Sequence, residues 1–444
     1  MTIDVHGHLS PPESLRRFPM PRSLGDAEAM IETKLAAGVD LTIIGSPVGA
    51  GAMVPVPGVD NYAQSEEELA RFHDWLGELV ARYPRHLRAY VYVNPFGGEA
   101  HLAAARARLG QDEFVGLIAN SSVAGRYLDH PDAADFFALA AETEAPVLLH
   151  APAAPAAGSG LTDLMALEQL GRFADVTIGL ASCVLGGWLE RHPGLRLVAQ
   201  GAGGALALLV EKLDRAWSPE HWQREGHTDG APNPGHGSGP GLGSGPGLGS
   251  GPGQGSGSGS EHGGGPRSGA GSGNAPDPGF GNGFRPGSGL GSGLGSGLGS
   301  GLGSDPGRGS GSGPGDGSRS GAGSDDAPGR GPGNGFRPGD GAGRARLGPA
   351  AHRLPHPPSS YLNRIWVDTA TPSAAAVELA LRVFGPDKVL YGTDSPPLPG
   401  ASVEGGLRLV ERLDIPEAQR QAVREGNARA LFGAGLPSPV PAGA

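Results

Sequence analysis

Cysteine is almost absent from this chain, which has one, Cys183, among its 444 residues. A single cysteine cannot form an internal disulfide, so the fold must rely on an apolar core, as is usual in a reducing compartment. Cys183 lies in the apolar run IGLASCVLGGWL, where we expect a small core residue rather than a nucleophile. The class of small disulfide-stabilised proteins is therefore excluded.

Long hydrophobic runs and basic clusters are also missing. No apolar stretch reaches the roughly eighteen residues that cross a bilayer, and the start, MTIDVHGH, lacks the basic and apolar regions of a signal peptide. The formal net charge is -11, and no Lys/Arg stripe with interleaved aromatic residues occurs. We therefore expect a cytoplasmic protein that binds neither membrane nor nucleic acid.

Aromatic residues make up only 5% of the chain, whereas Gly (81) and Pro (42) are abundant. Much of this excess lies in residues 219–356, in runs such as GSGLGSGLGSGLGS. These runs have too few large apolar side chains to offset the entropy cost of ordering, so we predict a disordered insert. We expect a folded domain in two parts, 1–218 and 357–433, followed by a disordered tail at 434–444.

Outside the predicted insert, short β-branched runs alternate with amphipathic helical patterns. The helical stretches, such as SEEELARFHDWLGELVARY, place apolar residues three to four positions apart. The eight strand candidates are residues 2–5, 41–44, 87–93, 114–118, 147–150, 195–199, 365–368 and 389–391. Eight strand–helix alternations in about 300 residues favour an α/β fold, the (β/α)₈ TIM barrel, over an open doubly wound sheet. We expect a last helix at 416–432.

Two histidines end the first strand candidate, in IDVHGH. Because alternate residues of a strand point the same way, His6 and His8 should face one side, at the carboxyl end where barrel enzymes build their active sites. Neutral imidazoles are good ligands for a divalent transition metal. Taken alone, a His-x-His pair is equally compatible with chance or with core packing.

Two further residues occupy equivalent positions. His150 ends the apolar run PVLLH, and Asp394 follows the run VLYGT. A carboxylate placed after such a run needs a cation or hydrogen-bond donors nearby. Four candidate ligands at the ends of strands one, five and eight are hard to explain by core packing. We therefore predict a metal site formed by His6, His8, His150 and Asp394.

The remaining polar features give weaker signals. Residues His73, His86, His101, His130 and His192 fall in helical patterns or polar loops, where we expect solvated side chains. Gly201–Gly204, the sequence GAGG, is expected to open a helix after strand six. Its amides could bind an anion, but close packing of a helix on a strand explains the glycines equally well.

Six motifs together resemble the amidohydrolase-related family, in the branch of aminocarboxymuconate-semialdehyde decarboxylase and related carboxy-lyases. They are IDVHGHLSPP, GRYLDHP, VLLHAP, LGGWLERHPGLRLV, VLYGTDSP and EGNARALFG, and they span nearly everything outside the insert. The resemblance implies one divalent metal, Zn²⁺ or Mn²⁺, at the positions of His6, His8, His150 and Asp394. No lysine ends strand four, where Leu117 and Ile118 stand, so a mononuclear site follows.

The resemblance also implies a function. We expect a carboxy-lyase that decarboxylates a small carboxylate-bearing substrate, with Asp394 also transferring a proton. A hydrolase of the same family is the alternative. Lys212 occupies a position where relatives have an arginine that helps to bind the substrate carboxylate, and relatives commonly form homodimers.

One departure from the family pattern affects catalysis. Relatives carry a histidine after strand six that acts as base or proton shuttle, whereas this chain reads LVAQGAGG. Depending on the alignment, Gln200 or Gly201 takes that position, and neither side chain titrates. A general base contributes on the order of a hundred- to ten-thousand-fold in rate. A catalytically impaired, metal-binding relative is therefore a further alternative.

Overall fold

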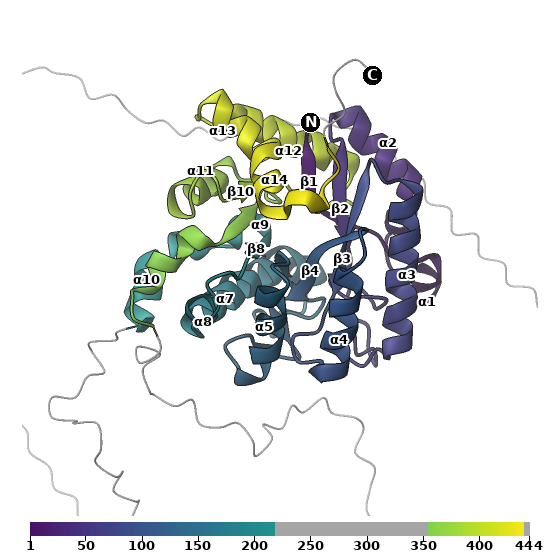
Figure 1. Cartoon of the computed structure of the whole chain (residues 1–444), viewed down its shortest axis with the longest axis horizontal. Helices are drawn as coiled ribbons and strands as arrows, with labels where there is room; N and C mark the ends of the chain where they lie inside the picture. The colour runs from purple at the N-terminus through teal and green to yellow at the C-terminus, as the bar shows by residue number, and fades with distance from the viewer. Residues whose placement is uncertain (218–353, 439–444) are drawn as a thin grey trace, which may run out of the picture. The chain divides into compact units, whose positions relative to one another are not determined.

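The computed structural model describes residues 1–217 and 354–438, which form a barrel of parallel strands surrounded by helices (Figure 1). Every predicted strand is present, with ends shifted by up to three residues. The barrel strands are β1 (Ile3–His8), β2 (Leu41–Gly45), β3 (Leu87–Tyr92), β4 (Phe114–Asn120), β7 (Val147–His150), β8 (Leu197–Ala199), β9 (Trp366–Asp368) and β10 (Val389–Leu390). Two further strands, β5 (Ser122–Val123) and β6 (Arg126–Tyr127), form a small hairpin.

The strand order is that of a (β/α)₈ barrel. The eight strands pair in the order β1-β2-β3-β4-β7-β8-β9-β10, all in parallel. The last and first strands meet where Val5 N donates to Tyr391 O at 3.0 Å and Asp394 N donates to His6 O at 2.9 Å. This contact brings residues from the two ends of the chain together, so the predicted TIM barrel is confirmed.

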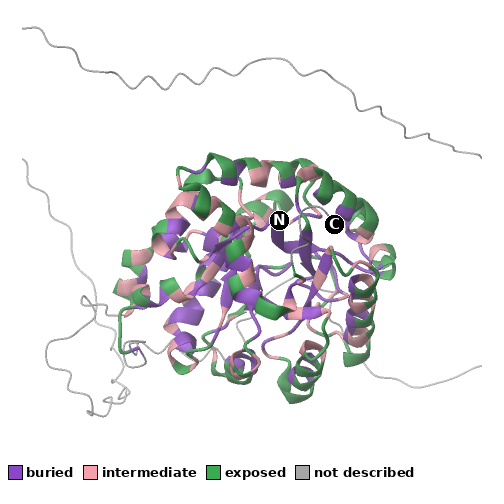
Figure 2. Cartoon of the chain, turned by 45° about the horizontal axis from the view of Figure 1, so that its top comes forward, coloured by how far each residue is buried: buried purple, intermediate pink, exposed green. Residues whose placement is uncertain are grey.

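Helices form the outer layer and present their polar faces outward, as Figure 2 shows by burial. α3 illustrates how the sequence encodes them: Ser65 caps its first turn and Glu68 returns the hydrogen bond, a capping box. The helices are α1 (Pro12–Arg17), α2 (Ala27–Ala37), α3 (Glu66–Arg82), α4 (Gly98–Leu109), α5 (Ala134–Glu142), α6 (Leu164–Ala166), α7 (Arg172–Leu185), α8 (Trp188–Arg191), α9 (Gln200–Gly203), α10 (Val210–Trp217), α11 (Ala374–Val383), α12 (Gly400–Arg412), α13 (Glu417–Gln421) and α14 (Asn427–Phe432). Among these described helices, none combines the length and apolarity needed to span a bilayer.

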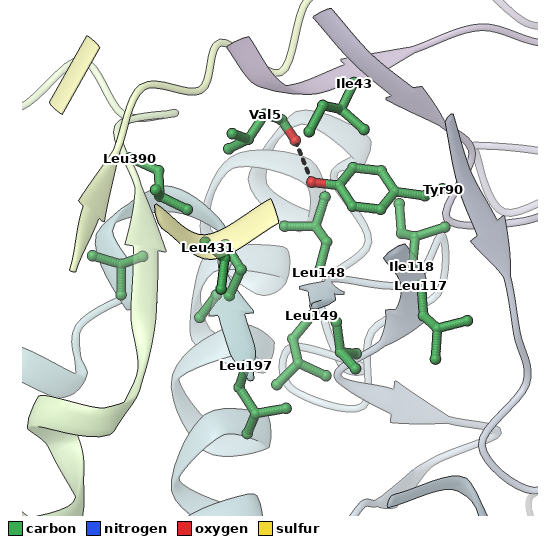
Figure 3. Packing of buried hydrophobic residues seen from close by; sticks show 14 of the residues in the cluster. Val5, Ile43, Tyr90, Leu117, Ile118, Leu148, Leu149, Leu197, Leu390 and Leu431 are labelled. Atoms are coloured by element: carbon green, nitrogen blue, oxygen red, sulfur yellow. Dashed lines mark hydrogen bonds between the residues drawn. The ribbon is translucent and has the colours of Figure 1, made fainter. Parts of the chain in front are cut away.

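The barrel interior is filled by large side chains rather than open. Tyr90 is 1% exposed, and its hydroxyl donates to Val5 O across the barrel at 2.8 Å (Figure 3). Ile118 and Leu148, which are paired in register on β4 and β7, are fully buried beside it (Figure 3). This packed core fills the barrel beneath the carboxyl ends of its strands. The polar residues at those ends are therefore held on a closely packed layer of side chains.

Most of the predicted insert lies outside the described residues, but both of its flanks are visible. Trp217 Nε1 donates to Leu354 O at 3.2 Å, so α10 and the segment leading to β9 lie side by side. Leu354 is 3% exposed, and the barrel therefore resumes three residues before the expected boundary at 357. Among the described residues, the insert is preceded by the helix α10 and followed by the segment that leads to the amino end of β9.

The carboxyl-terminal region differs from the prediction in two details. The expected helix at 416–432 is present but contains a π-helical turn at Ala422–Gly426. The expected disordered tail begins too early, because Leu436 is buried and Arg88 Nε donates to Gly435 O at 2.9 Å. The last part of that tail, 439–444, lies outside the described residues. Cys183 is fully buried, as expected.

Candidate metal site

The four predicted ligands converge at the carboxyl end of the barrel. His6 and His8 come from β1, His150 from the end of β7, and Asp394 from the segment after β10. One ligand atom from each lies within 4.8 Å of all the others. The histidine side chains are at most 4% exposed, whereas that of Asp394 is 29% exposed. Access to the cluster is therefore from the side of Asp394.

The three imidazoles surround one point with their Nε2 atoms. Their ring centroids are 4.9–5.1 Å apart and their planes are nearly perpendicular in every pair, at 82–87°. Asp394 Oδ1 lies 2.9 Å from His8 Nε2, 3.5 Å from His6 Nε2 and 3.9 Å from His150 Nε2. Edge-to-edge rings with a shared carboxylate oxygen are the arrangement that a single cation requires.

The Nδ1 atom of each imidazole lies beside a carboxylate or carbonyl oxygen, which can only accept a hydrogen bond. His6 Nδ1 lies 2.7 Å from Asp368 Oδ2, His8 Nδ1 lies 3.2 Å from Gly45 O, and His150 Nδ1 lies 2.7 Å from Ala151 O. Each Nδ1 must therefore carry the proton, which leaves the Nε2 lone pairs directed at the shared point. Such outer hydrogen bonds orient metal ligands and increase their basicity.

The electrostatics of the cluster favour a positive charge at its centre. Burial lowers the pKa of His6, but Asp368 and Asp394 outweigh it and raise that pKa to about 9. Burial lowers the pKa of His150 to about 4 and also lowers that of His8. Burial opposes ionisation of Asp394, but His6 and the other two imidazoles hold its pKa well below the ordinary value. His8 and His150 are thus neutral and Asp394 is ionised, the forms that bind metal, whereas His6 holds an extra proton that a metal ion would displace.

The residues fit a divalent metal ion by one further test. His150 Nε2 is buried and has no hydrogen-bond partner among the described residues. A buried polar atom without a partner costs free energy, so such atoms mark places where a ligand supplies the missing contact. Three neutral imidazoles with one carboxylate suit zinc, and manganese accepts the same donors.

A buried ion pair supports the ligands from behind. Asp4 Oδ1 accepts hydrogen bonds from His6 N at 2.9 Å and from Thr393 N at 3.1 Å. Asp4 Oδ2 is paired with Lys34 Nζ of α2, which also donates to Thr393 Oγ1 at 3.2 Å. Both charged residues are at most 2% exposed. The pair therefore joins the backbone of His6 to the residue that precedes Asp394.

Sequence reasoning missed Asp368 and Lys34, although both left a signal. Asp368 ends the apolar run RIWVD just as Asp394 follows its own run, and it is fully buried in the structure. Lys34 lies four positions after Met30 and three after Ile31, which places it on the buried face of α2. A charged residue on an apolar face indicates a buried partner.

A short helical segment, α9, does follow β8, but the GAGG residues form a left-handed turn there rather than the regular helix start that was expected. Gly201, Ala202, Gly203 and Gly204 all have positive φ, from 59° to 74°. At Gly204 an added Cβ would lie 2.3 Å from Thr177 Oγ1, which only glycine avoids. The glycines therefore serve a left-handed turn packed against α7.

Neither residue at the position of the family histidine takes over its chemistry. Gln200 Oε1 accepts from Ala151 N at 2.9 Å, beside His150. Gly201 N donates to Asp368 Oδ1 at 2.7 Å. Both residues hold the surroundings of the ligands in place, and neither provides a titrating group.

Other predicted residues lie elsewhere. Lys212 is exposed on α10, outside the four-residue cluster, and its role in substrate binding stays a prediction. The expectation of solvated histidines is wrong for two of them: His73 and His101 are only 5% and 6% exposed. Each accepts a backbone hydrogen bond through Nε2, His73 from Tyr92 N and His101 from Asn94 N. They are structural residues of α3 and α4.

A comparison with family profiles identifies the chain's relatives. The profile described as Amidohydrolase matches residues 3–229 and 331–434. The chain belongs to the amidohydrolase family. The gap in the match falls within the Gly/Ser/Pro-rich insert, and the four ligands lie inside the matched parts. The expectation of a metal-dependent enzyme of this family is thereby confirmed, while a comparison with curated proteins finds no match.

Several solved structures share the fold at low sequence identity. A 2,6-dihydroxybenzoate decarboxylase in complex with 2,6-dihydroxybenzoate has a TM-score of 0.56 and 13% identity, covering 97% of this chain and 98% of its own. The 5-carboxyvanillate decarboxylase of Sphingomonas paucimobilis has a TM-score of 0.56 and 15% identity, with the same coverage. A dihydroxybenzoic acid decarboxylase from a Polaromonas species, with bound manganese and 2-nitroresorcinol, has a TM-score of 0.55 and 13% identity, covering 97% and 96%. At these identities the likeness shows the fold.

Proposed function

We propose that this protein is a metal-dependent carboxy-lyase that decarboxylates a small aromatic or unsaturated carboxylic acid. The observation that carries the proposal is the convergence of His6, His8, His150 and Asp394 around one point, with each Nδ1 already bonded elsewhere. Decarboxylation is preferred to hydrolysis because of the family motifs, and the similar decarboxylase folds support this choice. We propose one Zn²⁺ or Mn²⁺ ion per chain.

The four ligands would hold the metal, and a bound divalent cation would act as a Lewis acid on an oxygen of the substrate. His8 and His150 provide neutral nitrogens, His6 would do so after releasing its extra proton to solvent, and Asp394 provides one negative charge. The packed barrel beneath the imidazoles excludes water from that side, which strengthens every electrostatic interaction in the site. The substrate would enter on the side of Asp394, where the cluster is exposed.

Asp394 is the residue to which we assign proton transfer. Loss of carbon dioxide breaks a C–C bond and leaves the electron pair on the substrate carbon, which must then gain a proton. Asp394 is ionised beforehand, so it can accept a proton from a substrate hydroxyl group or from solvent and deliver it to that carbon. Its low pKa favours delivery of the proton to the carbon and makes uptake of the proton the harder half of the transfer.

The absence of a histidine at position 200 or 201 leaves proton handling to Asp394. A hydrolase requires a base to activate water, and neither Gln200 nor Gly201 supplies one. This favours decarboxylation, in which the electron pair of the breaking C–C bond stays on the substrate carbon and no water has to be activated. The same absence is what favours an impaired relative that binds metal without turnover. Substrate binding by Lys212 and a homodimer remain proposals taken from the family resemblance.

The first experiment measures metal content and decarboxylation together. Purified protein is stripped with a chelator, reloaded with Zn²⁺ or Mn²⁺, and incubated with a panel of hydroxybenzoic acids while release of carbon dioxide is followed. We expect one metal ion per chain and decarboxylase activity that the chelator abolishes. The double variant His6→Ala/His8→Ala should release carbon dioxide at least a hundredfold more slowly than the wild type. His86→Ala, at a half-buried histidine outside the four-residue cluster, is the matched control and should retain full activity.

Three outcomes would contradict the proposal. Equal rates for the wild type and His6→Ala/His8→Ala would remove the metal from the mechanism. One bound metal per chain without turnover of any acid would instead favour the impaired relative, and hydrolysis of an amide or lactone in place of decarboxylation would favour the hydrolase.

A further inference from the structure

A groove of about 500 Å³ lies beside α12. One wall is a face of that helix, with lining residues at intervals of three to four positions: Ser402, Gly405, Leu409 and Arg412. The other wall comes from the segments after β9 and β10 and from the start of α11. The described residues that line the groove include none of the four at the candidate metal site. A cavity of this size suits a small organic molecule.

The groove is open because α12 carries glycine where a side chain would fit. A Cβ added at Gly405 would meet no heavy atom within 4 Å. At the neighbouring Gly406, an added Cβ would lie 3.5 Å from the Tyr391 side chain, which is an ordinary contact. Glycine inside a helix is destabilising relative to alanine. Since packing does not require glycine at position 405, the open space itself is the feature to explain.

Two arginines make the groove positively charged. Arg408 and Arg412 both line it and lie four residues apart on α12, so their side chains are neighbours. Arg408 is paired with Glu404 at 3.1 Å, but the two side chains are 53% and 58% exposed, and such a pair is weak. Arg412 has no hydrogen bond or ion pair among the described residues. The groove therefore has cationic donors available for an anion.

The remaining lining indicates which kind of anion fits. Thr371 and Ser402 add hydroxyl groups, while Leu398 and Leu409 provide apolar surface. A phosphate monoester carries nearly two negative charges at neutral pH and has three terminal oxygens. It can therefore bind two guanidinium groups and a hydroxyl group together, whereas a carboxylate offers two oxygens in one plane. The apolar surface then accommodates the group that is esterified.

The groove also contacts the backbone that leads to the metal site. Thr369, which follows Asp368, and Thr393, which precedes Asp394, both line it. Thr369 Oγ1 donates to Gly392 O at 3.2 Å and accepts from Gly392 N at 3.1 Å. A molecule in the groove would therefore touch the segment that positions Asp394 without entering the metal site.

We propose that this groove binds a phosphate monoester with a small apolar portion, and that the bound ester is an effector of the metal site. Arg408 and Arg412 bind the phosphate, and Leu398 and Leu409 contact the apolar portion. The bound ester holds the segment before Asp394 in place and so strengthens metal binding. Such coupling requires two distinct sites, which the groove and the four-residue cluster provide.

The first experiment measures binding of phenyl phosphate and of inorganic phosphate by calorimetry. The full-length chain is used both loaded with Zn²⁺ and stripped with a chelator. We expect Arg412→Gln and Gly405→Phe to bind phenyl phosphate at least about tenfold more weakly than the wild type in both forms. Inorganic phosphate should bind the wild type at least about fivefold more weakly than phenyl phosphate, because it lacks apolar contacts.

The matched control is Arg71→Gln. Arg71 is an exposed arginine of α3 that pairs with Glu67 four residues earlier, as Arg408 pairs with Glu404, so this variant should bind both probes as the wild type does. Absence of phenyl phosphate binding by the stripped wild type, or unchanged binding by Arg412→Gln and Gly405→Phe, overturns the site. Equal affinities for the two probes overturn the ester. If Gly405→Phe does not fold, Gly405→Leu replaces it.

The second experiment tests the effector role. The affinity for Zn²⁺ is measured by competition with a chromophoric chelator, with and without saturating phenyl phosphate. We expect the ester to raise the affinity of the wild type at least about threefold and to leave that of Arg412→Gln unchanged. An equal change in both proteins would place the ester at the metal, and no change in the wild type would show that the groove is not coupled to it. Either result overturns the effector role.

Discussion

At the scale of single residues, the metal site depends as much on hydrogen bonds behind the ligands as on the ligands themselves. Asp368 connects three parts of it: Oδ2 accepts from His6 Nδ1, and Oδ1 accepts from Gly201 N at 2.7 Å and from Ala370 N at 3.0 Å. Asp368 therefore fixes the tautomer of His6 and the turn after β8 together.

Replacing the Asp368 carboxylate should weaken metal binding without removing a ligand. In Asp368→Asn the side chain keeps its size but loses its negative charge, so His6 becomes a weaker donor to the metal. We expect Zn²⁺ affinity, measured by competition with a chromophoric chelator, to fall about ten- to a hundredfold. Exposed Asp387→Asn is the control, and an unchanged affinity for Asp368→Asn would show that His6 is positioned by other contacts.

At the scale of elements, helices and strands are joined by buried polar side chains that the apolar pattern does not reveal. His73 of α3 accepts a hydrogen bond from Tyr92 N of β3 at 3.0 Å. Burial, reinforced by Arg108 and His101, lowers the pKa of His73 to about 3. The neutral imidazole thus connects an outer helix to the barrel wall.

This contact predicts a loss of stability in acid. His73 has a folded-state pKa below its unfolded value of 6.5, so the unfolded chain binds the extra proton. Its contribution is fully present above pH 6.5 and is lost as the pH falls toward 3. Between pH 7.5 and pH 5 the free energy of unfolding should fall by about 2 kcal/mol on account of His73. Urea unfolding of the wild type and of His73→Gln at both pH values measures this, and an identical pH effect in both proteins would contradict it.

At the scale of the whole molecule, the barrel is completed by parts of the chain on both sides of the insert. Strands β9 and β10 and the ligand Asp394 follow it, whereas the three histidines precede it. The flanks of the insert are held together by Trp217 with Leu354 and by Asp214, whose carboxylate accepts from Ser359 N at 2.8 Å. Closing a loop costs free energy that grows only slowly with its length.

We therefore expect the insert to be dispensable for folding and for metal binding. Replacing residues 219–353 with a linker of about ten Gly/Ser residues keeps Trp217 and Leu354 in place. The melting temperature should change by less than about 3 °C, which corresponds to roughly 1 kcal/mol for a domain of this size, and the metal content should stay the same. Loss of soluble protein upon this replacement would show that the insert packs on the barrel, and Leu354→Ala in the full chain provides a destabilised reference.

The fold and the ligands could be predicted because their signals are local. Each strand is a short apolar run, and each ligand ends or follows one, so their position at the carboxyl rim follows from barrel geometry. The supporting residues could not be predicted in the same way. Lys34 and Asp4 become partners only when α2 packs on β1, and Asp368 meets His6 across 362 positions of sequence.

By itself, the sequence determined the alternation of strands and helices, the division of the chain by a Gly/Ser/Pro-rich segment, and which four side chains meet at the carboxyl rim. These features depend on side-chain spacing within one element, which is a property of consecutive residues. Only the tertiary structure decided which nitrogen of each imidazole is free, that the glycines after β8 form a turn, and that a groove opens beside α12. Those properties arise from contacts between distant residues, because a buried polar atom gains its partner, or lacks one, only when the chain has folded around it.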